Sequence, residues 1–265
     1  MKLIVQPVSG LMNRFRTICS SAILAEYTNR ELLINWKPES CCNIFLNDIV
    51  EDGFFKLGYD VNRYDCYYHS GYEKLSEQPF IDSMIETKEE ILYLLSGGNF
   101  KPNDMSLSEY NNKKSLFYNS IPFNSRIKNE ANNFILNNDS YEGIHLRFTD
   151  RSQWAPNLDY IENIINSSDV KFYICSDDRN VLNLIKLKFG DKILTYDVTN
   201  VNRNTKEGNI QSMIEWLILS NSSKIYYALG SSYSYEACLI NKLSNSIEMN
   251  PNNIQLDDLK IKLEF

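Results

Sequence analysis

The chain has 265 residues and a net charge of −7, from 27 basic and 34 acidic residues, with 43% hydrophobic residues. This length can bury a sizeable core in one large domain or two small ones. Such an acidic chain, with a pI near 5.0, is not expected to hold nucleic acid over a broad surface, so an anionic ligand needs a local basic pocket. Neither a signal peptide nor the run of roughly 18 apolar residues that spans a membrane is evident, and we expect a soluble protein.

The six cysteines stand at positions 19, 41, 42, 66, 175 and 238, without CxxC spacing and mostly in apolar surroundings. This pattern favours reduced, buried thiols over a disulfide framework or a zinc site. A reducing compartment follows, and we expect a cytoplasmic protein.

The N-terminal residues indicate a strand, a turn and a helix. Lys2–Gln6 is a compact apolar run, and helical spacing of apolar residues covers Asn13–Asn29. Glu31–Trp36 then predicts a second strand, which completes an opening βαβ unit of the doubly wound kind. This unit places Gly10–Arg14 at the crevice beyond the strand ends.

The middle of the chain, about 39–138, is rich in Asn, Ser and aromatic residues, and we expect long loops there. One helix is predicted at Thr87–Leu95, closed by Gly97 and Gly98. A second helix is predicted at Asn129–Leu136.

The polar segment Asn137–Ser140 marks the expected domain boundary. It gives two Rossmann-like domains, 1–138 and 139–265, and an α/β fold in which they face a cleft. In the second domain we expect strands at 143–146, 171–175, 192–196 and 223–228, and helices at 159–165, 180–188, 210–219 and 235–239.

A histidine, two arginines and an aspartate gather where the strand at 143–146 ends: His145, Arg147, Asp150 and Arg151. Ligands of open α/β sheets bind beyond the carboxyl ends of the strands. The guanidinium group offers a rigid fork of donors to paired phosphate oxygens, which suits a diphosphate. The alternative is an ordinary strand end with a surface ion pair between Asp150 and Arg151.

The first turn, Gly10–Arg14, lacks the spacing of a dinucleotide fingerprint and the lysine of a P-loop. It nevertheless ends at a helix N-terminus, where free N–H groups favour an anion and Asn13 can donate and accept hydrogen bonds. Alternatively, Asn13 caps the helix and Arg14 is solvated.

Two further polar turns follow predicted strands. Ser176, Asp177 and Asp178 precede one helix, and Gly230-Ser231-Ser232 precedes the last one. Carboxylates suit a ribose, a base edge or a sugar, and small residues let N–H groups approach a diphosphate. Helix caps explain each turn equally well when it is taken alone.

Four polar turns at strand ends of one alternating α/β chain favour a shared crevice over independent caps. Together they resemble the GT-B fucosyltransferase superfamily, which includes α-1,6-fucosyltransferases, nodulation fucosyltransferases and protein O-fucosyltransferases. The segments that carry the resemblance are Gly10–Arg14 with Ala25–Leu33, the H-x-R-x-x-D segment His145–Asp150, Phe172–Asp178, Arg203 through Gly208 to Ile214–Ser220, and Gly230–Ser234.

The resemblance implies an inverting, metal-independent transfer of fucose from GDP-fucose to a glycan or protein hydroxyl, without a cofactor. The first domain would be the acceptor side and the second would bind the nucleotide sugar. By resemblance, Arg147 binds the β-phosphate and is the catalytic residue, aided by the N–H groups of the Ser231-Ser232 turn. The remaining implied substrate-binding residues are Gly10, Asn13, Arg14, His145, Asp150, Arg151, Ser176, Asp177, Asp178, Arg203 and Glu236.

Several alternatives remain open. Phe148 stands where some relatives have a second arginine, so the donor could be another nucleotide sugar. The chain could also bind a nucleotide sugar or carbohydrate without turnover, or be a structural α/β protein. Metal-binding transferases often carry an Asp-x-Asp motif, and Asp177-Asp178 lacks that spacing. The aromatic segments Tyr64–Tyr72 and Gln153-Trp154 could stack on sugars or simply pack.

Overall fold

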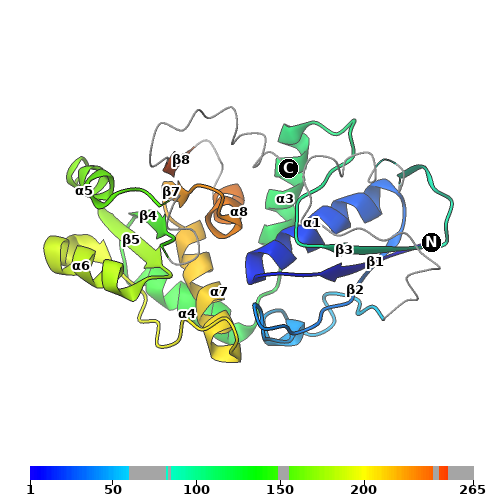
Figure 1. Ribbon diagram of the computed structural model, residues 1–265, viewed down its shortest axis with the longest axis horizontal. Helices are drawn as coiled ribbons and strands as arrows, with labels where there is room; N and C mark the ends of the chain where they lie inside the picture. Colours follow the sequence, from blue (N-terminus) through cyan, green and yellow to red (C-terminus); the bar gives the residue numbers. More distant parts are fainter. Residues whose placement is uncertain (60–81, 83–84, 149–154, 241–244, 250–265) are drawn as a thin grey trace. The chain divides into compact units, whose positions relative to one another are not determined.

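The computed structural model describes residues 1–59, 82, 85–148, 155–240 and 245–249, and the chain forms two compact units (Figure 1). The first unit comprises Met1–Asn124 and Asn202–Asn209. The second comprises Ser125–Val201 and the described chain from Ile210 onward. It therefore begins before the expected boundary at 138, and the assignment of acceptor and donor sides stays a prediction.

The first unit is built on a parallel sheet of order β2-β1-β3. Its elements are β1 (Lys2–Pro7), α1 (Leu11–Tyr27), β2 (Glu31–Ile34), the short 3-10 helix η1 (Leu46–Asp48), β3 (Ile91–Ser96) and α3 (Leu107–Ser120). The central strand β1 pairs Leu3 with Leu32 on one side and with Leu92 on the other. Because Leu3, Ile4 and Val5 are fully buried, β1 needs the continuous apolar run that the sequence shows.

The helix predicted at Thr87–Leu95 is wrong, since this segment forms strand β3, Ile91–Ser96. A short apolar run does not distinguish a buried strand from a buried helix by periodicity alone. Leu92 and Leu94 are fully buried and Tyr93 is 4% exposed. Burial on successive residues is what a strand of a parallel sheet covered on both faces requires.

Helix α3, Leu107–Ser120, lies where the sequence predicted loops. Its start is a capping arrangement in which the Ser106 hydroxyl accepts a hydrogen bond from the N–H of Glu109. A serine followed three residues later by glutamate is a sequence signature of a helix start. This helix is polar and has little apolar periodicity, so its sequence pattern did not predict a helix.

The second unit contains a parallel sheet of order β6-β5-β4-β7-β8. Its elements are α4 (Ser125–Leu136), β4 (Tyr141–Leu146), α5 (Leu158–Asn166), β5 (Lys171–Ser176), α6 (Arg179–Phe189), the 3-10 helix η5 (Gly190–Lys192), β6 (Ile193–Leu194), the part of α7 (Lys206–Ser220) from Ile210 onward, β7 (Ile225–Ala228), α8 (Ser232–Ile240) and β8 (Ser246–Met249). The chain runs outward from β4 to β6, then returns to add β7 and β8 on the other side of β4. This order confirms the predicted α/β class and puts a topological switch point between β4 and β7.

The strand register brings three loops to one edge of this sheet. Leu146 at the end of β4 is the partner of Ser176 at the end of β5. On the other side, Ile144 is paired with Tyr226, and both β4 and β7 end two residues later. The residues that follow β4, β5 and β7 therefore leave the sheet at the same level.

The described cysteines are free thiols, and Cys19, Cys42, Cys175 and Cys238 are buried. Burial raises the pKa of the Cys42 thiol to about 12, and burial likewise raises that of Cys238 to about 12. These groups are therefore protonated at neutral pH, as expected for thiols with a structural role. Cys66 lies outside the described residues.

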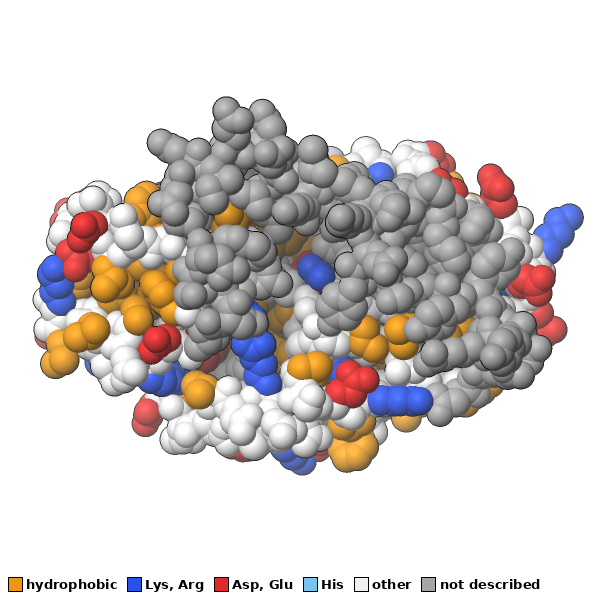
Figure 2. Space-filling view, viewed as in Figure 1, with side chains coloured by type: hydrophobic (Ala, Val, Ile, Leu, Met, Phe, Trp, Pro, Cys, Tyr) orange, Lys and Arg blue, Asp and Glu red, His pale blue; other side chains and the backbone are white. Residues whose placement is uncertain are grey.

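None of the described helices combines the length and the hydropathy that a membrane-spanning segment needs. Figure 2 shows basic side chains scattered among acidic and neutral ones on the face in view. Exposed apolar side chains also occur, with Leu184 and Leu187 of α6 at 58% and 84% exposure. The visible coloured surface thus carries no continuous basic strip.

Gly143 in β4 allows α7 and the turn after it to pack closely on the sheet. A Cβ atom at this position would lie 2.4 Å from Ser222 Oγ and 2.7 Å from Leu219 Cδ1. We expect Gly143→Ala to lower the free energy of unfolding by about 1–3 kcal/mol, because neighbours must shift. Urea unfolding measures this loss. Gly10→Ala is the control: nothing lies within 4 Å of a Cβ there, and an equal loss in both variants would contradict the packing explanation.

Candidate functional site

Arg147 is the first residue after the buried end of β4. Leu146 before it is fully buried, whereas Arg147 itself is half-buried. The guanidinium group therefore starts from the edge of the sheet at the switch point, where open α/β sheets bind ligands. Asp150 and Arg151, predicted to act with it, lie outside the described residues.

The pairing of β4 with β7 brings the turn after β7 to the same edge of the sheet as Arg147. Gly230 has φ +69°, a backbone conformation that glycine adopts without a steric cost. The N–H of Ser231 closes the turn on the carbonyl oxygen of Ala228 at 3.1 Å. The Ser231 side chain is 5% exposed, and its buried hydroxyl has no hydrogen-bond partner. An unpaired buried hydroxyl costs free energy and fits a site completed by a ligand.

Helix α8 starts directly after this turn at Ser232. The first N–H groups of a helix lack intrahelical acceptors, and the helix dipole adds a partial positive charge there. Together with Ser231 and Arg147, this end of α8 presents hydrogen-bond donors and positive charge at one edge of the sheet. Such an arrangement suits a phosphate or diphosphate.

The first turn of α8 is fixed by four side-chain contacts. Nδ1 of the buried His145 lies 3.0 Å from the Ser234 hydroxyl, and its ring centroid lies 5.0 Å from that of Tyr233. The Tyr233 hydroxyl donates to the carbonyl oxygen of Ser212 at 2.6 Å. Trp216 Nε1 donates to the carbonyl oxygen of Tyr233 at 2.9 Å. His145 is thus placed where it supports the helix that borders the site.

The two aspartates after β5 have different partners. Asp178 caps α6, with Oδ1 accepting from the N–H groups of Asn180 and Val181. Its contacts are those of an ordinary N-cap. Asp177 Oδ1 instead accepts from the N–H of Phe148 at 2.8 Å, and so joins the loop after β5 to the loop after β4.

Ser176, Glu236 and Arg203 were also predicted as contacts. Ser176 is buried, and its hydroxyl accepts from the N–H of Asp178 at 3.1 Å. Glu236 is fully buried in α8. Arg203 belongs to the first unit and is exposed, and its carbonyl oxygen accepts from the N–H of Asn43.

Glu215 was not predicted as a functional residue. It is 8% exposed on α7, and its Oε1 is buried without a hydrogen-bond partner. Burial raises the pKa of its carboxyl to about 8, against an opposing effect of Arg179. A single acid within the apolar run Ile214–Leu219 is the signal that could have identified it.

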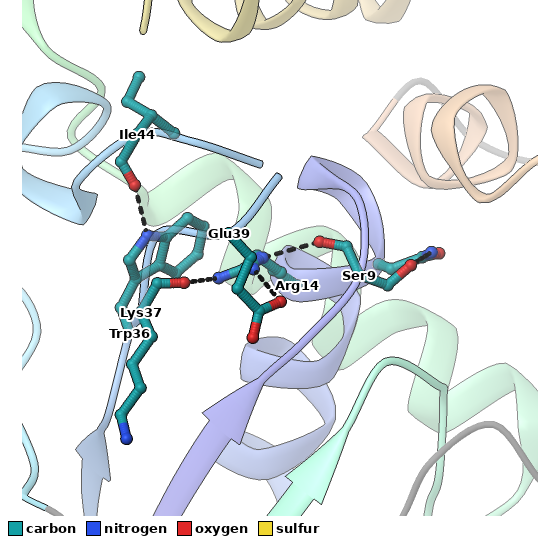
Figure 3. Close-up of polar contacts among 7 residues, drawn as sticks. Ser9, Arg14, Trp36, Lys37, Glu39 and Ile44 are labelled. Carbon is teal, nitrogen blue, oxygen red and sulfur yellow. Dashed lines mark hydrogen bonds and ion pairs between the residues drawn. The ribbon is translucent and has the colours of Figure 1, made fainter. Parts of the chain in front are cut away.

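Arg14 lies completely buried in the first unit (Figure 3). Its Nε donates to the carbonyl oxygen of Ser9 at 2.8 Å, and its Nη1 donates to that of Lys37 at 2.6 Å. Nη2 forms an ion pair with Glu39 at 2.9 Å, and the guanidinium lies 4.9 Å from the Trp36 ring centroid. These contacts tie the loops after β1 and β2 together, so the described role of Arg14 is structural.

Ser9, Gly10 and Asn13 form the polar turn after β1. Ser9, rather than Gly10, takes the positive φ, at 72°, and its Oγ accepts from Asn13 Nδ2 at 2.8 Å. Gly10 is the N-cap residue of α1, which has no side-chain cap and no acid in its first turn. Asn13 is therefore not the cap. It lies in the first turn of α1, where open N–H groups favour an anion or hydroxyl.

Several solved structures have a fold similar to this one. Fucosyltransferase NodZ from Bradyrhizobium is 16% identical with a TM-score of 0.62, over 90% of this chain and 93% of that one. A mutant of Arabidopsis thaliana FUT1 in complex with GDP is 14% identical with a TM-score of 0.63, over 91% and 68%. POFUT1 in complex with GDP-fucose is 9% identical with a TM-score of 0.57, over 95% and 98%.

The sequence matches no protein-family model and no curated protein. The similarity is therefore one of fold: this chain has the α/β fold of the GT-B fucosyltransferases, as its resemblance implied.

The buried carboxyl of Glu215 predicts a pH-dependent stability. Its pKa is about 8 in the folded chain against an ordinary value of 4.5, so the folded state holds one more proton between these values. The free energy of unfolding should therefore fall as the pH rises, by at most about 1.4 kcal/mol per pH unit. Glu215→Gln removes this titration, and its stability relative to the wild type should rise from about pH 5 to about pH 8.

Urea unfolding at both pH values measures this difference. Glu26→Gln, at a side chain that is 68% exposed, is the matched control. A stability difference between wild type and Glu215→Gln that is the same at both pH values would contradict the raised pKa.

Arg14→Ala should destabilise the first unit. It leaves the carbonyl oxygens of Ser9 and Lys37 without their donor and removes the contact with Trp36, for a loss of about 3 kcal/mol or more. Chemical denaturation measures it. Glu39→Gln should cost less than about 1 kcal/mol, because the Glu39 side chain is 40% exposed. An equal loss of the free energy of unfolding in Arg14→Ala and Glu39→Gln would instead assign the stabilisation to the ion pair.

Proposed function

We propose that this protein is an inverting glycosyltransferase that moves fucose from GDP-fucose to a hydroxyl group of a glycan or protein. The observation that carries the proposal is the edge of the second sheet. Arg147 and the glycine turn at the start of α8 leave the sheet at this edge, and the buried Ser231 hydroxyl in that turn lacks a partner. This combination suits a diphosphate at a topological switch point.

In the proposed reaction, an acceptor oxygen attacks the anomeric carbon of fucose from the face opposite GDP. The new carbon–oxygen bond forms as the bond from the anomeric carbon to the β-phosphate oxygen breaks, its electron pair leaves with GDP, and the acceptor hydroxyl loses its proton to water. Negative charge grows on the departing diphosphate. Arg147, the Ser231 hydroxyl and the N-terminal N–H groups of α8 would stabilise that charge, and preorganised donors of this kind often supply the largest catalytic contribution.

GDP-fucose is proposed as the donor because structural relatives contain GDP or GDP-fucose. The first unit would supply the acceptor side through the turn of Ser9, Gly10 and Asn13 at the start of α1. Its switch point lies between β1 and β3, where the N–H of Val8 donates to the carbonyl oxygen of Ser96. Arg14 would hold the backbone of this turn through its hydrogen bond to Ser9 rather than contact the substrate.

Metal independence is part of the proposal. A guanidinium group and a helix N-terminus carry the positive charge that a divalent cation supplies to diphosphates in other transferases. Transfer should therefore persist in excess chelator. Full loss of activity in chelator, restored by Mg²⁺ or Mn²⁺, would contradict this part.

Thermal unfolding with GDP, GDP-fucose, UDP and CMP, each with and without Mg²⁺, tests the donor. A ligand at 100 times its dissociation constant adds about 2.7 kcal/mol, which is a shift of several degrees for a chain of this size. We expect shifts with GDP and GDP-fucose alone. No shift with any nucleotide would overturn the proposal, whereas binding without transfer to any acceptor would support a non-catalytic nucleotide-sugar-binding protein.

Arg147→Ala should reduce fucose transfer by about 10²–10³-fold, as does the loss of one donor to a developing anion. Turnover of GDP-fucose with a glycan acceptor measures it. Arg126→Ala is the matched control, because Arg126 lies on α4 in an exposed ion pair with Glu130 and should leave turnover unchanged. Similar turnover by wild type and Arg147→Ala would exclude Arg147 from catalysis.

A further inference from the structure

Asp177 holds the backbone immediately after Arg147. Its Oδ1 accepts from the N–H of Phe148 at 2.8 Å. The pairing of Leu146 with Ser176 places Asp177 level with Arg147 along the neighbouring strand. The carboxylate therefore joins the two loops at the point where the guanidinium leaves the sheet.

Phe148 is anchored a second time through its side chain. Its partly buried ring packs against the core cluster of the second unit, which includes Ile144, Leu146 and Ile174. The residue before Arg147 is held by the strand, and the residue after it is held by the core and by Asp177. The backbone on both sides of Arg147 is therefore fixed before a ligand binds, which lowers the entropy cost of binding.

The adjacent carboxylate has a different function. Asp178 accepts from two N–H groups at the start of α6, so the helix cap does not require Asp177. The contact of Asp177 with Phe148 is thus a separate feature of this loop.

We propose that Asp177 is a positioning residue that fixes Arg147 for the diphosphate of the donor. This rests on the proposed function. Because Asp177 acts through the hydrogen bond to Phe148, its effect on nucleotide affinity should depend on the presence of the Arg147 guanidinium.

GDP affinity, measured by calorimetry, tests this in the wild type, Asp177→Ala, Arg147→Ala and the double variant. We expect Asp177→Ala to weaken GDP binding about tenfold in the wild-type background, as for the loss of one hydrogen bond. It should have no further effect in the Arg147→Ala background, because coupled residues are not additive. The same fold-loss in both backgrounds would overturn the proposal.

Asp177→Asn separates positioning from charge. Its amide oxygen can still accept from Phe148, so its GDP affinity should stay within about threefold of the wild type. A tenfold loss in Asp177→Asn would assign the effect to charge and overturn the proposal. This comparison also stands if the alanine variant fails to fold.

Asn157→Ala controls for general destabilisation. Asn157 caps α5 by accepting from the N–H of Tyr160, so its loss removes one side-chain–backbone hydrogen bond from the same unit. GDP affinity should be unchanged in this variant, and an equal loss would overturn the positioning role. Absence of GDP binding in the wild type would instead overturn the proposed function, and with it this role.

Discussion

The parallel pairing of β4 with β5 on one side and β7 on the other is the constraint on which the candidate site depends. Because the strands share one direction, their carboxyl ends meet at a single edge. The chain reverses its order at β4, which makes this edge the switch point where open α/β sheets bind ligands. A guanidinium, a glycine turn and a helix N-terminus thereby converge from segments that are more than 80 residues apart in sequence.

Burial of polar groups separates structural support from ligand contact. Arg14 is fully buried, and its guanidinium donates hydrogen bonds to protein oxygens. Ser231 is nearly as buried, but its hydroxyl has no hydrogen-bond partner. The first pattern holds loops in place. An unpaired buried hydroxyl lowers the stability of the fold, and a ligand that bonds to it can restore that free energy. This second pattern is the stronger indication of a binding site.

Sequence patterns predicted the elements whose burial is uniform. The strands at 141–146 and 171–176 are buried on both faces over most of their length, and the glycine turn before α8 is recognisable by its residue types. The run at 91–96 has the same character but was assigned to a helix, since a short apolar run fits both. Helix α3 was not predicted, because its only clear sequence signal is the capping residue at its start and not an apolar periodicity.

Side-chain roles were less predictable than elements. The four polar turns were found because their residue types are unusual at strand ends, but the sequence could not separate cap from contact at Asp177 and Asp178. That distinction depends on which N–H groups the fold brings within reach. Glu215 was overlooked because its surroundings are set by strands and helices distant in sequence.

The buried thiols give each unit an internal reporter of its own opening. Alkylating and disulfide reagents react with the thiolate, which is scarce when burial raises the pKa to about 12, as at Cys42 and Cys238. Labelling of either residue must therefore wait for a local fluctuation that exposes it to water. Because Cys42 belongs to the first unit and Cys238 to the second, the two labelling rates would measure the opening of each unit separately within one intact chain.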